Sequence, residues 1–338
     1  MGWKSTLGTL RWAVRAPRQR WRHLRSGQID LATVFLHPTT DIVGSGDFHL
    51  GAGAAVGRHA VMVAGPGCTL EIGEGAWIGN DCEIDAAPSV RIGARTSLQH
   101  RSQILGSVQL GAGCVCAANL YISSGMHRFA DTAHLPVRVQ DFRARQASDR
   151  AASTVVVGAD CWVGINVVVL PGVTIGRGCV IGANSVVRSD LPPYSIAVGS
   201  PARVVKSRLN FDPPAAIDAS RDDHIPYFYS GLRQLARTEA GDKSCPRVRD
   251  GWPTVPAFSL ALQASAGDRA ELQIDALCGG QLIHGDHRMS VHPGRQTACF
   301  PVHQGRWGQL HFNWHSGNAG IADALVVLSA KITRGEAA

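Results

Sequence analysis

The sequence has no run of eighteen apolar residues, the length needed for a membrane-spanning helix. Its N-terminus also lacks the apolar stretch and small-residue cleavage site of a secretory signal peptide. It has no Cys-x-x-Cys pair, and its nine cysteines are odd in number. Zinc sites and disulfide frameworks need cysteines in pairs at suitable spacing. We therefore expect a cytoplasmic chain with buried free thiols and no metal.

The body of the chain has almost no net charge. The formal charge is +7, but residues 1–30 hold seven Lys or Arg against one Asp, which leaves twenty-six cations against twenty-five acidic residues elsewhere. A nucleic-acid-binding protein would carry a basic surface on its body. We therefore expect no nucleic-acid partner.

Residues 1–30 predict a basic amphipathic helix. One face of its helical wheel is apolar, with Trp3, Leu7, Leu10, Val14, Trp21 and Leu24. Another face carries Arg11, Arg15, Arg18, Arg22 and Arg25. Such a helix suits an anionic membrane surface, which residues 1–26 would contact from the cytoplasmic side. Packing within an oligomer is an equal alternative, and Pro17 disfavours a continuous helix.

The strongest positive feature is a period of six residues. Counting in sixes from Ile72, with a two-residue slip after Ile84 and a long interruption after Ile122, an apolar residue falls on every count. These positions are Ile72, Ile78, Ile84, Ile92, Leu98, Ile104, Leu110, Cys116, Ile122, Val157, Val163, Val169, Ile175, Ile181 and Val187. Gly follows at eight of the fifteen, whereas 38 glycines in 338 residues predict fewer than two. Neither a helix nor a single alternating strand has this period.

A coil of short strands explains the period. Each aliphatic residue points inward, the following Gly occupies a corner that a side chain would crowd, and the fifth position of each unit is often small. One unit cannot bury its own apolar face, so successive coils must stack on a shared core. An earlier stretch around Leu50, Val56 and Met62 extends the repeats towards residue 34. At ~4.8 Å per coil we expect roughly seven coils.

Residues 155–206, "VVVGADCWVGINVVVLPGVTIGRGCVIGANSVVRSDLPPYSIAVGSPARVVK", resemble the hexapeptide-repeat acyltransferases. The resemblance spans about residues 34–206. It implies an all-β chain whose main domain is a left-handed parallel β-helix, together with an acetyl-coenzyme A donor and a homotrimer with active sites between subunits. The segment "SPAR" resembles the terminal N-P-A-R of the family, with Ser200 in place of Asn.

The repeat is interrupted once, and a loop over residues 128–154 fills most of the gap. Long excursions from a compact scaffold are usually functional. His127 stands at its mouth, where the resemblance places the general base. A hydroxyl with a pKa near ~15 attacks a thioester slowly unless a base removes its proton, and histidine suits that role. His134 is the alternative base, and His100 ranks lower.

Several residues could assist this histidine. Asp131, Asp141, Glu83 and Asp85 are candidates for an orienting carboxylate, and the sequence does not choose among them. The loop arginines Arg128, Arg138 and Arg143 could hold an acidic sugar or a diphosphate, or could be a solvated surface.

The resemblance also implies a donor groove along the last coils. It places Trp162 beside the pantetheine arm, and the backbone at Gly164, Gly182 and Ala183 against its amides. It places Arg188 and Arg203, with Lys206 as a further candidate, near the coenzyme phosphates. The glycines have corner geometry as a second explanation.

The repeats end near Val205. Residues 207–252 predict a linker with one helix around residues 229–236, and residues 253–334 predict a β-sandwich-like module. Strand patterns occur at 257–263, 271–277, 309–315 and 324–332. Six histidines in this module invite a metal hypothesis, but with one carboxylate among them we favour solvated surface histidines.

Together these features predict an acetyl-coenzyme A-dependent acyltransferase that modifies a hydroxyl or an amine of a sugar. We expect the acceptor in a cell-surface polysaccharide or its lipid-linked precursor. A small-molecule acceptor, such as an amino acid or a nucleotide sugar, is the alternative. A non-catalytic trimeric scaffold is less favoured, as is a zinc hydratase of the carbonic-anhydrase kind that would use His100, His127 and His134.

Overall fold

The structure is a computed structural model that describes residues 29–130, 132, 134–146, 153–232, 252–265, 267–303, 306–316 and 325–334. The chain divides into two compact units, Met1–Asn210 and Phe211–Ala338. The predicted N-terminal helix lies outside the described residues except for its last two positions. No helix in the described ranges is long and apolar enough to cross a membrane.

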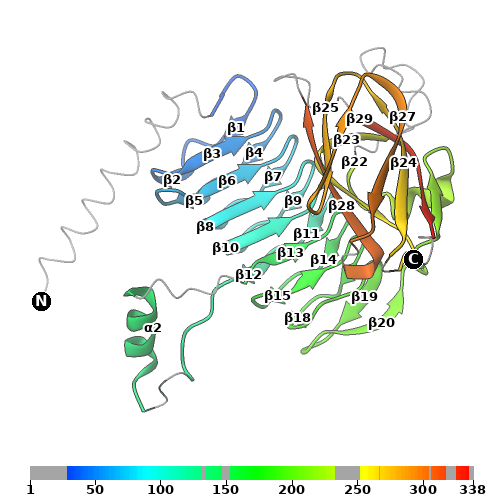
Figure 1. Ribbon diagram of the computed structural model, residues 1–338. Helices are drawn as coiled ribbons and strands as arrows, with labels where there is room; N and C mark the ends of the chain where they lie inside the picture. The colour runs from blue at the N-terminus through cyan, green and yellow to red at the C-terminus, as the bar shows by residue number, and fades with distance from the viewer. Residues whose placement is uncertain are drawn as a thin grey trace, which may run out of the picture. The chain divides into compact units, whose positions relative to one another are not determined.

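The first unit is a parallel β-helix whose coils stack one on the next (Figure 1). One face is a sheet of nine strands, of which only the last runs antiparallel to its neighbour. In spatial order these strands are β1 (Phe35–Leu36), β4 (Ala55–Val56), β7 (Trp77–Ile78), β9 (Ser97–Leu98), β11 (Val115–Cys116), β14 (Trp162–Val163), β17 (Val180–Ile181), β19 (Ser195–Val198) and β20 (Arg203–Ser207). The eight parallel strands give about eight coils, one more than expected.

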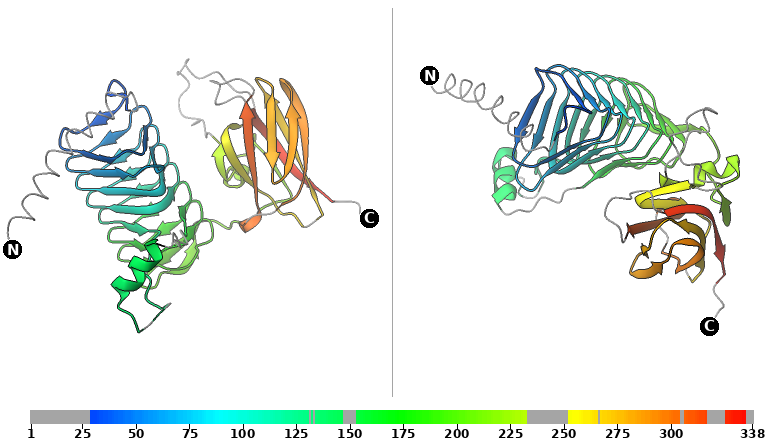
Figure 2. Two further views of the ribbon diagram at one scale, coloured as in Figure 1. Left: turned by 60° about the vertical axis from the view of Figure 1, so that its left-hand side comes forward. Right: turned by 90° about the horizontal axis from the view of Figure 1, so that it is seen from above.

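The other two faces of the prism share one sheet of eleven strands, because β8 (Glu83–Ile92) and β10 (Gln103–Leu110) continue around a corner. The second face also contains β2 (Asp41–Gly44), β5 (Val61–Ala64), β12 (Tyr121–Ser123), β15 (Val168–Val169) and β18 (Val186–Val187). The third contains β3 (Asp47–Leu50), β6 (Thr69–Ile72), β13 (Val155–Val157) and β16 (Thr174–Ile175). Figure 2 shows the stacked coils from two further directions.

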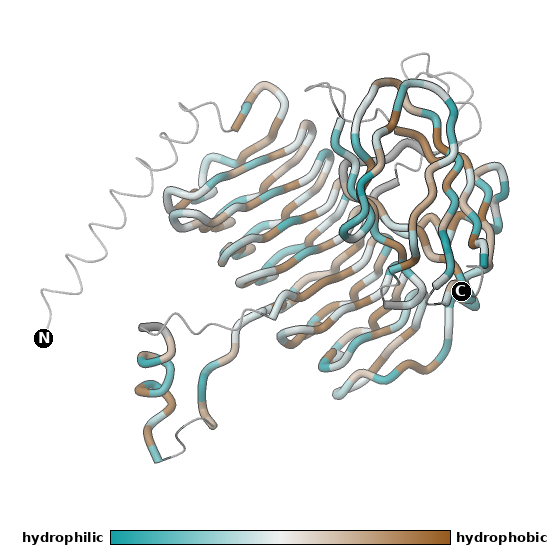
Figure 3. Tube along the Cα trace, viewed as in Figure 1, coloured by the Kyte–Doolittle hydropathy of each residue, from teal (hydrophilic) through white to brown (hydrophobic). Residues whose placement is uncertain are grey.

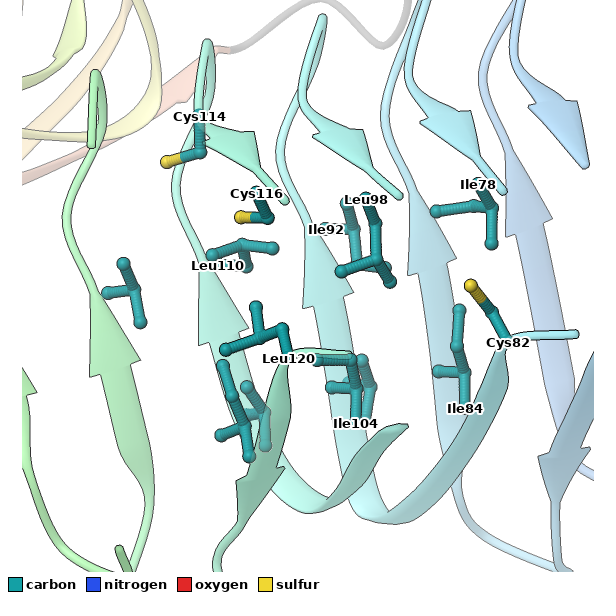
Figure 4. Close-up of a cluster of buried hydrophobic side chains, with 14 of the residues drawn as sticks. Ile78, Cys82, Ile84, Ile92, Leu98, Ile104, Leu110, Cys114, Cys116 and Leu120 are labelled. Carbon is teal, nitrogen blue, oxygen red and sulfur yellow. The ribbon is translucent and has the colours of Figure 1, made fainter. Parts of the chain in front are cut away.

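The interior of the coils is the repeat itself. All fifteen apolar positions of the six-residue count are buried, none more than 2% exposed. Figure 4 shows several of them pointing into the space between the faces, among them Ile78, Leu98 and Ile104. Because stacked strands pair in register, as Ile78 with Leu98, each residue packs on its own counterpart in the next coil. The predicted parallel β-helix is confirmed.

The corners explain the glycines and the small residues. A Cβ added at Gly93 would lie 2.3 Å from the backbone nitrogen of Ala112 in the next coil, so this position admits no side chain. The small fifth-position residues are buried, and their hydroxyls and thiols bond to corner carbonyls. Thr96 Oγ1, for example, donates to the carbonyl of Gly111 at 2.7 Å. Where the fifth position is Ser, Thr or Cys, the side chain is therefore short enough for the corner and also able to donate a hydrogen bond.

The second unit is an antiparallel sheet that folds over on itself. Its strands and 3₁₀ helices are β21 (Ala216–Asp218), η1 (Asp222–Tyr227), β22 (Ser230–Leu232), β23 (Trp252–Ala261), β24 (Arg269–Ala276), β25 (Gly280–His284), β26 (His287–Val291), β27 (Gly294–Pro301), η2 (Arg306–Gly308), β28 (Gln309–Ser316) and β29 (Leu325–Thr333). The start of β23 pairs with β29 and its end pairs with β28, which joins two layers. Figure 3 shows apolar and polar residues intermixed along its strands.

The two layers enclose their own core, in which Phe258 stacks on Phe312 with ring centroids 5.2 Å apart. The predicted sandwich-like module and its four strands are confirmed, and three further strands, β25 to β27, were not predicted. The predicted linker needs correction. The second unit begins at Phe211, β21 pairs with β29, and Ser230–Leu232 form a strand where a helix was expected. Residues 233–236 of that expected helix are not described.

Candidate active site

The excursion leaves the coils after β12 and returns at β13, at the corner between the second and third faces. The stack continues across this gap without a slip. Ile122 before the excursion pairs with Val169, and Val157 after it pairs with Leu110. The excursion is therefore an addition at one corner, and it can carry chemistry without disturbing the core.

A helix within the excursion, α2 (Val137–Gln146), was not predicted from the sequence (Figure 1). Pro136 directly precedes it, and proline is favoured at a helix start because its φ is already helical. The Pro136 carbonyl accepts hydrogen bonds from the N–H groups of Val139 and Gln140, at 2.8 and 3.1 Å. This start signal and the ten residues without Gly or Pro were the evidence available in the sequence.

Helix α2 brings a carboxylate to His127. Nδ1 of His127 contacts Asp141 Oδ2, and the N–H of Arg128 donates to Asp141 Oδ1 at 2.8 Å. One carboxylate therefore holds both the ring and the adjacent backbone. The Asp141 side chain is only 18% exposed, whereas that of His127 is 76% exposed. The histidine is anchored on one side and open to solvent on the other.

This arrangement assigns the two ring nitrogens. An ionised carboxylate can only accept hydrogen bonds, so the Nδ1–H of neutral His127 donates to Asp141. Nε2 then carries a free lone pair on the exposed side of the ring. An oriented, accessible imidazole nitrogen can take a proton from a hydroxyl or an amine as it attacks an acyl group.

The other predicted bases and orienting carboxylates have different positions. His134 is exposed ahead of α2, and Asp131 lies outside the described residues. Glu83 Oε2 accepts a hydrogen bond from Gln103 Nε2 on the second face. His100 Nδ1 accepts the N–H of Asn80 at a coil corner and its ring meets the edge of Trp77, so it has a structural role. Of the predicted partners, the structure pairs Asp141 with His127.

The predicted donor residues lie on and around the first face. Trp162 projects outward from β14 and is 57% exposed. Strand pairing continues from Trp162 through Val180 and Ile196 to Lys206, so the indole and the lysine share one outward row. Three strand spacings separate them, roughly 14 Å. Arg203 is exposed on the same last strand.

The predicted glycines have a structural explanation. A Cβ at Gly164 would lie 2.6 Å from the backbone nitrogen of Ala183, so stacking alone requires Gly there. The N–H groups of Gly164 and Gly182 already donate to Ile181 and Ala197 in neighbouring coils. These two N–H groups are therefore committed to the stack, and corner geometry suffices to explain Gly164.

The remaining basic candidates are on the surface. Arg138 and Arg143 are exposed on α2, Arg128 adjoins the histidine with its side chain half-buried, and Arg188 is exposed after β18. The structure thus brings Arg128 to the His127–Asp141 pair and places the two α2 arginines on the same excursion. Among the described residues no group of three His, Cys, Asp or Glu is arranged to hold a metal ion.

The cysteine beside Trp162 is unsuited to nucleophilic chemistry. Cys161 is only 1% exposed, and Cys161 Sγ donates to the carbonyl of Gly176 at 3.3 Å. Hydrogen bonding to the Cys114 and Cys179 thiols, together with burial, raises the pKa of Cys161. A buried thiol held in its protonated form neither reaches nor attacks an acyl donor.

Comparison with known proteins finds two family models. Residues 154–189 match the bacterial transferase hexapeptide (six repeats), and residues 89–124 match the hexapeptide repeat of succinyl-transferase. A probable acetyltransferase of Mycobacterium tuberculosis, Rv3034c, is 35% identical over 224 residues, which cover 62% of this chain and 66% of that protein. The putative colanic acid biosynthesis acetyltransferase WcaF of Escherichia coli is 29% identical over 46% of this chain and 71% of its own length.

Other matches cover less of the chain. The putative acetyltransferase SAR2635 of Staphylococcus aureus is 46% identical over 23% of this chain and 39% of its own length. The chain thus spans just under two thirds of the M. tuberculosis relative and about two fifths of the S. aureus one. The solved structure of the hexapeptide-repeat acetyltransferase VCA0836 of Vibrio cholerae with acetyl coenzyme A is 26% identical, covers 41% of this chain and 72% of that one, and has a TM-score of 0.35.

Proposed function

We propose, from the premise that this chain belongs to the bacterial hexapeptide-repeat transferases, that it moves an acetyl group from acetyl-coenzyme A to a hydroxyl of a sugar. One observation carries the chemistry, namely the anchored His127 with its open Nε2 at the mouth of the excursion. An acyl transfer between a thioester and a hydroxyl requires one well-placed base and no redox or metal group.

The proposed transfer is direct. Nε2 of His127 takes the acceptor's hydroxyl proton while the oxygen attacks the thioester carbonyl. The carbon–sulfur bond then breaks, and the coenzyme A thiolate leaves and takes up a proton from the imidazolium. Asp141 keeps Nδ1–H in place and stabilises the positive ring between these two events. The buried, protonated Cys161 supports a mechanism without an acyl-enzyme.

The donor is proposed to lie along the first face. The row from Trp162 to Lys206 offers an apolar surface for the pantetheine arm and a cation for phosphate at the far end. Arg188 and Arg203 add positive charge around the last coils. The acceptor is proposed to enter on the excursion side, where Arg128, Arg138 and Arg143 suit an acidic or phosphorylated sugar.

A polysaccharide precursor is the proposed acceptor. The name of the E. coli relative, which refers to colanic acid biosynthesis, supports this class, as do the excursion's arginines. We also propose that the enzyme acts at the cytoplasmic surface of the membrane, which residues 1–26 would contact.

A homotrimer is also proposed, because the first face presents apolar side chains to solvent. Phe35, Trp77, Val115 and Trp162 are between 38% and 60% exposed on its outward side. Side-by-side packing would cover this face and let the base of one copy meet the donor row of its neighbour. Sedimentation should give a trimer, and a mixture of His127→Ala and Trp162→Ala chains should regain part of the activity that each lacks alone. A fully active monomer would rule out this arrangement.

The test of the activity is a donor assay on the full chain. Release of the coenzyme A thiol is measured with acetyl-coenzyme A and a panel of free, nucleotide-linked and lipid-linked sugars. We expect acceptor-dependent thiol release and an ester-linked acetyl group on the product. Absence of release with every acceptor class, despite donor binding, would contradict the proposal. An acetylated cysteine found by mass spectrometry during turnover would contradict direct transfer.

A further inference from the structure

Gln140, next to Asp141 in α2, is one of the few buried polar side chains of the excursion. It is only 5% exposed, although Val139 and Phe142 in the same helical turn are exposed. Its Oε1 accepts the N–H of Thr132 at 3.2 Å. Its Nε2 donates to the carbonyls of Leu135 and Phe129, at 2.8 and 3.4 Å. One side chain therefore bonds to backbone groups across the whole turn between His127 and α2.

The chemistry of this environment selects glutamine. The turn presents one N–H donor and two C=O acceptors, and a primary amide offers one acceptor and two donors. A glutamate here could accept from Thr132 but would place its oxygens against two carbonyls. A methionine has a similar volume and would make none of the three bonds. The side chain is thus specified by its hydrogen bonds and not only by its size.

The position of Gln140 links this network to the reacting group. Asp141 follows it directly and bonds to the His127 ring and the Arg128 N–H. Gln140 bonds to the backbone of the residues that come next, beginning with the carbonyl of Phe129. Two adjacent helical residues thus attach α2 to the segment from 127 to 135. If the Gln140 bonds were lost, α2 could shift relative to this segment and the carboxylate would no longer fix the ring. A displacement of about 1 Å can cost on the order of 10²-fold in rate.

We propose that Gln140 is a positioning residue for acyl transfer, which holds α2 against the turn so that Asp141 fixes the His127 ring with Nε2 facing the acceptor. This inference rests on the proposed function for its kinetic consequence, but its geometric part can be tested without activity. Gln140 is buried and bonded to the backbone of the turn, so it acts through Asp141 and His127.

The first experiment compares Gln140→Met with Val139→Ala in the full-length chain. Val139 neighbours Gln140 in α2 but is exposed, so its truncation leaves the turn intact. We expect Gln140→Met to lower kcat by about 10- to 100-fold, with the KM for acetyl-coenzyme A unchanged, and Val139→Ala to match the wild type. A wild-type kcat in Gln140→Met, or a kcat loss as large in Val139→Ala, would overturn the proposal.

A double-mutant cycle with Asp141→Asn distinguishes positioning from general destabilisation. If Gln140 acts through Asp141, adding Gln140→Met to Asp141→Asn should lower kcat by less than twofold more. If the two losses multiply, Gln140 acts by another route and the proposal fails. Because the excursion lies outside the stacked core, these variants should leave the coils folded. Circular dichroism of each variant checks this.

The geometric part is read from the ring itself. Nitrogen-detected NMR of labelled protein, with the His127 signal assigned by its loss in His127→Ala, reports which ring nitrogen carries the proton in the neutral state. We expect a single Nδ1–H tautomer in the wild type and in Val139→Ala, and a mixture in Gln140→Met and Asp141→Asn. An unchanged tautomer in Gln140→Met would overturn the positioning role even if no acceptor is ever found. A protein without transferase activity but with these shifts would instead refute only the proposed function.

Discussion

The two units of this chain bury their cores by opposite means. In the coils a strand pairs in parallel with the next turn of the chain, as Leu98 does with Cys116 eighteen positions later. In the second unit strands pair antiparallel across long separations, as Arg269 does with Thr333, 64 positions away. The coils thus repeat one local contact many times, whereas the second unit depends on contacts that differ from strand to strand.

This difference determines what a single residue can do. In the coils the position within the six-residue count decides whether a side chain is inward, at a corner or outward, and an insertion at a corner leaves the rest unchanged. The excursion with His127 and Asp141 is such an insertion. In the second unit strands from distant parts of the chain share one core, so a functional insertion would disturb more of it. We therefore expect the chemistry to reside in the coils and the stability of the two units to respond differently to change.

The largest expected effect follows from this separation. His127→Ala should lower turnover by roughly 10²- to 10⁴-fold without changing donor affinity, because a general base acts in the transition state. His284→Asn, a change of a buried histidine in the second unit, should leave turnover within about twofold. Initial rates and equilibrium donor binding measure both. Near-normal turnover in His127→Ala, with turnover abolished in His134→Ala, would show that the base was misassigned.

The sequence predicted the coils well because one period governs them. The fifteen inward positions counted from Ile72 to Val187 could be named in advance, because their burial follows the count of six. The candidate base could be located because the same count fails at the excursion. Its partner could not be chosen, because Asp141 reaches His127 through the placement of α2, which no period describes.

Less of the second unit was predictable. Alternation identified strands such as Gln309–Ser316, but β25 and β26 were missed, although Gly285 and Asp286 between them form a two-residue hairpin connection. The pairing of β21 with β29 brings residues 216–218 into this unit across more than a hundred positions. Such a contact leaves no local signal, so the boundary at Phe211 could not be derived from the sequence.

The second prediction compares how damage spreads. Phe312→Ala should cost about 3–5 kcal/mol of stability, because it removes a ring packed against Phe258 and Phe300. Gly111→Ala should cost about 1–3 kcal/mol, because its Cβ would meet the backbone of Ala159 at 2.4 Å. Hydrogen exchange should rise throughout the second unit in the first variant, and only in the coils next to Gly111 in the second. If hydrogen exchange rose along all the coils in Gly111→Ala, the claim that a change in the coils stays local would be wrong.

The third prediction concerns acid. His284 Nδ1–H donates to the carbonyl of His311, and Nε2 accepts the N–H of His303. Burial lowers the pKa of His284 below the ordinary value of about 6.5. The unfolded chain therefore binds a proton first as the pH falls. The stabilisation is fully present above pH ~6.5 and is lost as the pH drops towards the lower folded value.

This acid effect should distinguish the two units. The free energy of unfolding of the second unit should fall by up to about 1.4 kcal/mol per pH unit for this buried histidine. His287 and His303, whose rings adjoin, should repel a charged His284 further. The fluorescence of Trp314 measures the second unit, and His284→Phe should flatten the dependence. A midpoint that rises on acidification would contradict the assignment.

The smallest expected effect concerns exposed asparagines. At one corner of the coils Asn119, Asn166 and Asn184 form a ladder in which each amide nitrogen donates to the next amide oxygen, at 2.8 and 2.9 Å. All three have positive φ, near 60°, a conformation that asparagine tolerates better than alanine. Asn166→Ala should therefore cost about 1–2 kcal/mol, from the strained backbone and two exposed hydrogen bonds.

Two matched variants separate these causes. Asn166→Gly relieves the backbone but removes the bonds, so it should cost less than about 1 kcal/mol. Asn313→Ala, on the exposed side of an extended strand in the second unit, should stay within about 0.5 kcal/mol. Denaturant midpoints of the three variants give the comparison. If Asn313→Ala cost as much as Asn166→Ala, an exposed amide would matter equally in both units. That result would disprove the idea that stacking a corner residue on its own counterpart in the next coil adds to the stability of the coils.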